Sequence, residues 1–179
     1  MNKEDGLKPA SALNEYLEIS ITIWNGCYGI EPIKDSLAYN VLSSFPRPAS
    51  IKTAYSQGDL FIEAGADYSM ALINTLTEPL ETVARWACAR GAVESAALSV
   101  WLFDSKANRR QRVKRSLALR HAGFQEQIKF LNAINKHSDS QKSLERIGEI
   151  VRKRTELGFV KIIYYDTCRL LGVATIEFP

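Results

Sequence analysis

Two charged side chains, Arg90 and Glu94, lie four residues apart in an otherwise apolar stretch and could line a polar pocket. Residues at this spacing are neighbours on one face of a helix. Because charge inside an apolar bundle is costly unless it is paired, we expect these two to form an ion pair. That pair has two interpretations: a structural salt bridge that fixes helix packing, or part of a ligand pocket within a helical bundle.

A strongly basic segment follows, with no acidic residue between Asp104 and Glu126. Three of its cations are predicted to point outward: Arg112, Lys114 and Arg115. Such a face could attract phosphate groups or an acidic partner, although it could equally be an ordinary solvated surface. Arg109 and Arg120 fall on or beside the apolar stripe of the same segment. We expect both to reach over the core, with Glu94 as one partner.

The remaining candidates for chemistry are two histidines and three cysteines. His121 lies at the edge of the apolar stripe, where a histidine is more often structural than catalytic, and His137 lies in a polar segment. The cysteines are far apart and form neither a metal-ligand spacing nor a disulfide framework. The sequence contains no hydrolase, metalloprotease, P-loop or dinucleotide-binding motif. It therefore predicts no metal site and no cofactor.

Two long helices must position these residues. The first is expected at about 78–103, with Thr77 as N-cap, and it is apolar on most sides, which is typical of the central helix of a bundle. Its one narrow polar face is expected to carry Glu81, Arg85, Ser95 and Ser99. The second, basic helix is expected at about 106–134, capped by Asp104 or Ser105 and packed on the first.

The rest of the chain also favours helices, predicted at 11–26, 32–45, 54–76 and 143–157. The β-branched run at 19–24 makes a strand an alternative for the first of these. Residues 1–10 are predicted as a flexible tail, 45–50 as a loop and 137–143 as a turn. The part after 159 could form a strand or a helix. We therefore predict an all-α bundle of four to six helices, with 11–179 as a single domain.

Composition limits the class of protein further. The chain has 179 residues, 46% of them hydrophobic, which suits one domain with a real core. The net charge is only +3, so any basic signal is local. The polar N-terminus does not resemble a signal peptide, and no uninterrupted apolar run reaches the roughly 18 residues of a membrane span. We predict a cytoplasmic protein that does not interact with a membrane.

Residues 57–131 resemble a group of uncharacterised bacterial helical proteins. The resemblance rests on an Arg-x-x-x-Glu-Ser/Ala-Ala helix that ends in Trp-Leu-x-Asp and precedes an arginine-rich helix. The matching residues are Arg90, Glu94, Ser95, Ala96, Trp101, Leu102, Asp104, Arg109, Arg112, Arg115 and Arg120. That group implies an all-helical fold but no particular activity.

The same region is similar in outline to HEPN-type domains, which are often RNases with an Arg-x(4–6)-His motif. Arg115 and His121 satisfy that spacing. The resemblance implies that Arg115 contacts the scissile phosphate and that His121 acts as general acid or base. In a continuous helix the two side chains lie about 120° apart, so a shared site needs an interrupted helix or a second copy of the chain.

These observations give three hypotheses of function. The first is a HEPN-like protein of a defence or toxin system that binds or cleaves RNA. The alternative is a non-enzymatic helical interaction module whose basic helix docks an acidic partner. The third is a ligand pocket in the bundle around Glu94 and Arg120. A homodimer is compatible with each of them.

Overall fold

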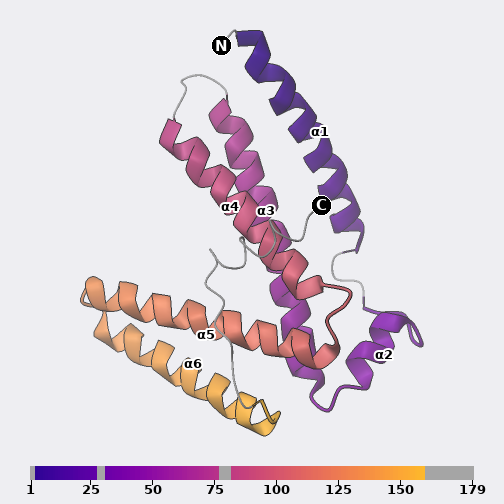
Figure 1. The fold of residues 1–179 in the computed structure, drawn as a ribbon, viewed down its shortest axis with the longest axis vertical. Helices are drawn as coiled ribbons and strands as arrows, with labels where there is room; N and C mark the ends of the chain where they lie inside the picture. The colour runs from indigo at the N-terminus through magenta and orange to yellow at the C-terminus, as the bar shows by residue number, and fades with distance from the viewer. Residues whose placement is uncertain (1–2, 28–30, 77–81, 160–179) are drawn as a thin grey trace.

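The computed structural model describes residues 3–27, 31–76 and 82–159, and these residues form six helices and no strand (Figure 1). The helices are α1 (Lys3–Cys27), α2 (Leu37–Ser43), α3 (Pro48–Leu76), α4 (Thr82–Phe103), α5 (Arg109–Ala133) and α6 (His137–Glu156). The predicted all-α bundle is confirmed. Within the described ranges, none of the helices has the length and apolar character of a membrane-spanning segment.

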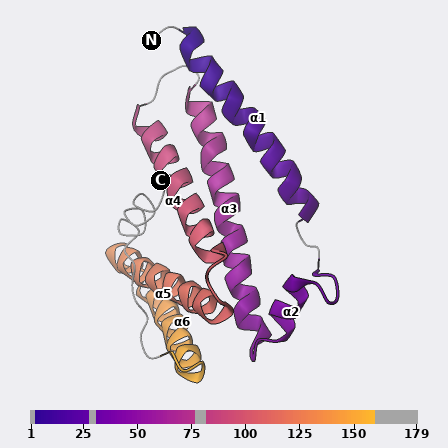
Figure 2. The same ribbon diagram turned by 45° about the vertical axis from the view of Figure 1, so that its right-hand side comes forward.

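The helices form two groups that meet at one end of α3 (Figures 1 and 2). In the first group α3 and α4 form an antiparallel hairpin, and α1 packs along α3. In the second group α5 and α6 form another hairpin, which crosses the N-terminal half of α3. The short helix α2 packs beside the start of α3. The helices α4 and α5 are therefore not packed along each other as predicted, because they meet mainly at the corner between them.

Several predicted boundaries move. Helix α1 begins at Lys3, so most of the predicted tail 1–10 is helical, and the strand alternative at 19–24 is wrong. Helix α3 begins within the predicted loop 45–50, because Pro48 fits the first turn, where no backbone N–H is required. The predicted turn 137–143 is the start of α6. Thr77, Glu81 and the segment after 159 lie outside the described residues.

Local capping explains where α2 and α5 begin. Asp35 has a left-handed φ of 68°, and the Ser36 hydroxyl accepts a hydrogen bond from the Tyr39 N–H, so α2 is shorter than predicted. Asn108, rather than Asp104 or Ser105, is the N-cap of α5. Its side chain accepts from the Gln111 N–H while the Gln111 side chain accepts from the Asn108 N–H, which is a capping box.

The hydrophobic core lies where α3, α5 and α6 meet. Its buried members are Ile51, Val113, Leu117, Ala118, Ile150 and Phe159. The apolar stripe predicted for the basic helix supplies Val113 and Leu117, and α6 supplies Ile150, which is almost completely buried. This end of the molecule therefore holds the buried hydrophobic cluster, which fixes how the start of α3 faces α5 and α6.

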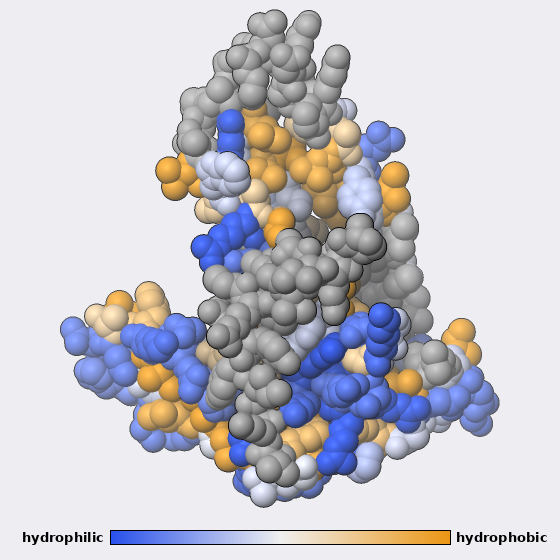
Figure 3. All heavy atoms as spheres, viewed as in Figure 1, coloured by the Kyte–Doolittle hydropathy of each residue, from blue (hydrophilic) through white to orange (hydrophobic). Residues whose placement is uncertain are grey.

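Helix α4 is not the central helix of the bundle, and that prediction is wrong. Its narrow polar face packs against α3, because Ser95 and Ser99 are only 7% and 6% exposed. Several of its large apolar residues lie on the opposite side, where Trp86 is 74% exposed, although Leu102 near its end is completely buried. Figure 3 shows hydrophobic surface over the group formed by α1, α3 and α4, at the top of the view, whereas hydrophilic and hydrophobic residues alternate over the α5–α6 hairpin. The small residues approach α3 closely, whereas Val83, Trp86, Val93 and Val100 stay exposed.

Candidate functional site

The guanidinium of Arg112 lies at the corner between α4 and α5 and does not point outward as predicted. Its Nε donates to the Leu102 carbonyl at 2.8 Å and its Nη2 donates to the Asp104 carbonyl at 3.0 Å. Its Nη1 donates to the Tyr55 hydroxyl at 2.6 Å, and the guanidinium carbon lies 5.1 Å from the centre of the Tyr55 ring. Arg112 therefore joins α3, α4 and α5 and satisfies carbonyls at the end of α4.

Arg115 has a similar place and is also not outward. Its Nη1 donates to the Trp101 carbonyl at 2.5 Å and to Asp104 Oδ2 at 3.1 Å, and the guanidinium lies over the Trp101 ring. Hydrogen bonding from the Lys106 backbone N–H, together with the nearby Arg115, lowers the pKa of Asp104. Lys114, the third predicted outward cation, is half-buried. The predicted phosphate-binding face is therefore used largely for internal contacts.

His121 is buried, with 8% of its surface exposed. Burial lowers its pKa, and the positive charge of Arg154 on α6 lowers it further. His121 thus faces α6, while Arg115 of the same uninterrupted helix reaches the end of α4. Within one chain the structure does not bring the two predicted catalytic residues together.

Arg90 and Glu94 form the predicted ion pair, with Nε and Oε1 2.7 Å apart. The pair is not buried in the bundle, because the Arg90 side chain is 70% exposed and that of Glu94 is 25% exposed. Arg120 lies elsewhere, in a cavity that Glu94 does not line. The third hypothesis, a pocket shared by Glu94 and Arg120, therefore lacks one of its two residues.

Arg109 was expected to reach over the core toward Glu94, but its contact is an exposed hydroxyl. Its guanidinium donates to the Ser44 hydroxyl just after α2. The neighbouring Arg110 donates to the carbonyls of Leu157 and Gly158 at 2.8 and 3.2 Å, after the end of α6. Both arginines of the first turn of α5 thus fix its position against other helices.

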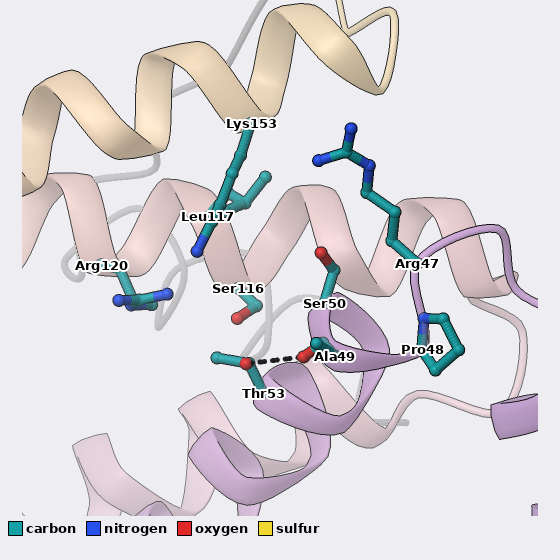
Figure 4. Close-up of a pocket in the computed structure, with 9 residues that line it drawn as sticks. All are labelled: Arg47, Pro48, Ala49, Ser50, Thr53, Ser116, Leu117, Arg120 and Lys153. Atoms are coloured by element: carbon teal, nitrogen blue, oxygen red, sulfur yellow. Dashed lines mark hydrogen bonds between the residues drawn. The ribbon is translucent and has the colours of Figure 1, made fainter.

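A cavity of about 370 Å³ lies between the start of α3, the middle of α5 and the end of α6 (Figure 4). It is lined by Arg47, Pro48, Ala49, Ser50, Thr53, Ser116, Leu117, Arg120 and Lys153. Figure 4 shows the Lys153 side chain extending from α6 across the space, with Arg120 on one side of it and the Ser116 hydroxyl below it. The cavity therefore combines polar groups from all three helices.

All the charged side chains that line this cavity are cationic. Three of the lining residues are cationic and none is acidic. Arg47 forms an ion pair with Glu156 on α6. Arg120 and Lys153, by contrast, form no side-chain hydrogen bond or ion pair with another described residue. The first turn of α3, residues 48–51, has no acidic side chain, so the positive end of that helix dipole adds to the field.

Sequence reasoning identified Arg120 but missed Arg47 and Lys153. These two are far from Arg120 in the chain, and only the packing of three helices brings them to one cavity. Two signals in the sequence could have indicated them. Arg47 lies directly before Pro48, which starts α3, and Lys153 lies in the basic last turn of α6. Among the described residues no group of histidine, cysteine, aspartate and glutamate side chains could hold a metal ion.

The chain matches no family model, no curated protein and no solved structure. The resemblances drawn from the sequence therefore remain expectations, and a function has to be argued from the geometry of the cavity.

Proposed function

We propose that this protein binds a phosphate-bearing ligand in the cavity between α3, α5 and α6. The observation that carries the proposal is the pair Arg120 and Lys153, whose cationic side chains line one cavity without an anionic partner among the described residues. Two cations in a shared space repel each other, and an anion between them removes that repulsion. The arrangement thus has a net electrostatic preference for a bound negative charge.

The chemistry of the lining favours phosphate over a simple carboxylate. An arginine offers a planar fork of donors and a lysine offers a point charge, and both are common phosphate ligands in proteins. The Ser50 hydroxyl comes from the first turn of α3, where the helix dipole is positive, whereas the Thr53 hydroxyl donates to the Ala49 carbonyl at 2.8 Å. A phosphate with several oxygens can use donors from more than one of these groups at once.

The size of the cavity suits more than a free ion. Ligand pockets in proteins typically have volumes of about 300–1,000 Å³, and this cavity is at the lower end of that range. A phosphate with an attached sugar or nucleoside would fit such a space. Two sources of the phosphate remain for the experiment to separate: the backbone of single-stranded RNA, which the HEPN-like outline favours, and a small phosphorylated molecule.

RNA cleavage by Arg115 and His121 stays a prediction and is not part of this proposal. Arg115 already donates to a carbonyl and a carboxylate, and His121 faces α6. A cleavage site would need a second copy of the chain to supply one of the two groups. Binding without turnover is therefore the function that the cavity supports best.

The test is equilibrium binding of a short single-stranded RNA and, separately, of a nucleoside monophosphate and inorganic phosphate. We expect Arg120→Gln and Lys153→Gln each to weaken binding about tenfold, since each removes one charge-assisted contact. If RNA is the ligand, the salt dependence of its affinity should also become shallower, by about 0.7 in the log–log slope for each cation removed.

The matched control is Arg146→Gln combined with Lys142→Gln. Both residues are exposed on α6 outside the cavity, and the double variant loses the same charge as Arg120→Gln with Lys153→Gln. Equal weakening by the two double variants would mean that only net charge matters, and the proposed cavity site would then be wrong. Binding of inorganic phosphate without binding of RNA would identify a small phosphorylated ligand.

A further inference from the structure

The exposed face of α4 has a regular spacing that the packing among the described helices does not use. Its residues follow intervals of three, four, three, four and three positions: Val83, Trp86, Arg90, Val93, Ala97 and Val100. This is the a/d spacing of a coiled coil, in which a stripe repeating every seven residues contacts a partner helix. The stripe is about 26 Å long at 1.5 Å per residue.

Five of the six positions of the stripe are exposed, and Ala97 is half-buried. Val83 is 83% exposed, Trp86 is 74%, Val93 is 57% and Val100 is 64%. It lies opposite the face that carries Ser95 and Ser99, which packs against α3. A contiguous exposed apolar surface of this kind is unusual for a monomer and commonly marks an interface.

The stripe is complementary to itself when it is reversed. Turning a second α4 antiparallel, about a midpoint between Gly91 and Ala92, places Val83 opposite Val100 and the large Trp86 opposite the small Ala97. Arg90 then lies opposite Val93, beside the Glu94 of the other copy. A parallel arrangement would instead place Arg90 against Arg90 and Trp86 against Trp86, which is unfavourable for both charge and volume.

We propose that α4 pairs with α4 of a second copy of this chain as an antiparallel two-helix coiled coil. In this dimer the Arg90 of each copy approaches the Glu94 of the other, in addition to the ion pair that Arg90 and Glu94 form within one chain. The interface is isologous, since the same surface serves both partners, which is the commonest symmetry of protein dimers. This inference is independent of the phosphate-binding proposal, because no residue of the stripe lines the cavity.

The first test is the molar mass of the full chain, measured by sedimentation over a range of concentrations. We expect a dimer for the unchanged protein and at least a tenfold weaker dimer for Val100→Lys, which places a lysine at each end of the paired stripes. The matched control is Val151→Lys, because Val151 is an exposed valine on α6. It should leave the dimer unchanged.

A charge exchange gives the sharper test. Arg90→Glu brings two carboxylates together across the interface, and Glu94→Arg brings two guanidinium groups together, so we expect each variant alone to be largely monomeric. An equimolar mixture of the two variants should form a heterodimer, because every facing pair is then opposite in charge. The ion pair within each chain is broken in both variants, so a local effect on α4 cannot produce this rescue.

Two results would overturn the proposal. A monomeric unchanged protein at concentrations of about 100 μM would show that the stripe does not pair with itself at any affinity expected of a stable interface. If Val100→Lys then also lowered the melting temperature of that monomer, the stripe would be covered by another segment of the same chain. A mixture of Arg90→Glu and Glu94→Arg that stays monomeric, while the unchanged protein is dimeric, would exclude the antiparallel pairing.

Discussion

At the scale of single residues, the arginines of α5 complete the end of α4. The last carbonyls of a helix have no partner within that helix, and they need donors from elsewhere. Arg112 and Arg115 supply those donors to the carbonyls of Trp101, Leu102 and Asp104. Side chains of α5 thus hold the turn between α4 and α5 in place by hydrogen bonds to its backbone. The abundance of arginine here has a structural cause.

Arg112 is the residue of this corner whose loss should cost most. We expect Arg112→Ala to lower the free energy of unfolding by about 2 kcal/mol, because half-buried carbonyls and the Tyr55 hydroxyl lose a charged donor. Arg112→Lys should recover little of this, since an ammonium cannot serve three separated acceptors in one plane. Urea denaturation measures both. Arg146→Ala, at an exposed arginine of α6, is the control and should change stability by less than about 0.5 kcal/mol.

The buried His121 predicts a pH dependence of stability. Its pKa is lowered in the folded state, by burial and then by Arg154, from the ordinary value of 6.5. As the pH falls below 6.5, the unfolded chain therefore binds a proton more readily than the folded one, and stability decreases. The full contribution is present above this ordinary pKa, and the slope below it cannot exceed about 1.4 kcal/mol per pH unit for one proton.

Denaturation midpoints measured between about pH 5 and 8 should show this loss in the unchanged protein. His121→Gln should remove most of the slope in that window, because Asp104 and Asp139 have lowered pKa values and titrate at lower pH. Burial and Glu63 raise the pKa of Asp59, which gives a dependence of the opposite sign. His137→Gln is the matched control at an exposed histidine and should keep the slope. An unchanged slope in His121→Gln would show that another group is responsible.

At the scale of elements, periodicity predicted the existence and type of most helices but not which face of α4 is inside. A helical wheel separates two faces, and the usual rule assigns the apolar one to the core. In α4 the close approach of α3 decides which face is buried. Gly91 lies so near the Tyr68 ring that a Cβ atom there would be 2.7 Å from it, which leaves room only for small residues on that face. The cavity shows a similar limit of sequence analysis. The helical wheel indicated Arg120, but it could not indicate Arg47 and Lys153, because only tertiary packing brings these two to the cavity.

Two glycines of α3 test this account of close packing. A Cβ at Gly58 would lie 2.5 Å from Cζ of Phe103, whose ring also stacks on Tyr55, so we expect Gly58→Ala to destabilise the protein by about 1 kcal/mol. A Cβ at Gly65 would lie 3.7 Å from its nearest neighbour, the Cβ of Ser95, which is ordinary contact. Gly65→Ala should therefore be neutral or stabilising by up to about 1 kcal/mol, since alanine favours a helix. Thermal unfolding of the pair measures the difference, and equal effects would contradict the packing described.

At the scale of the whole molecule, burial is unevenly distributed. The buried cluster joins α3, α5 and α6 at one end, whereas α1 buries only Ala10 and Leu17 among its described side chains. Tyr16 and Ile19 of α1 are 68% and 55% exposed. Regions with few buried contacts open locally without unfolding of the rest. The cavity proposed to bind phosphate lies beside this buried cluster, since Leu117 belongs to the cluster and also lines the cavity.

Hydrogen exchange should reveal this gradient directly. We expect the amides of α1 to exchange well before those around Val113 and Leu117 in α5, because opening α1 exposes little buried surface. Ile150→Ala should lower global stability by about 3 kcal/mol and speed exchange throughout the α3–α5–α6 junction, since it leaves a cavity at a fully buried site. Leu17→Ala should speed exchange in α1 alone. Equal acceleration in α5 by Leu17→Ala would mean that α1 unfolds together with the core, and that the two groups of helices form one cooperative unit.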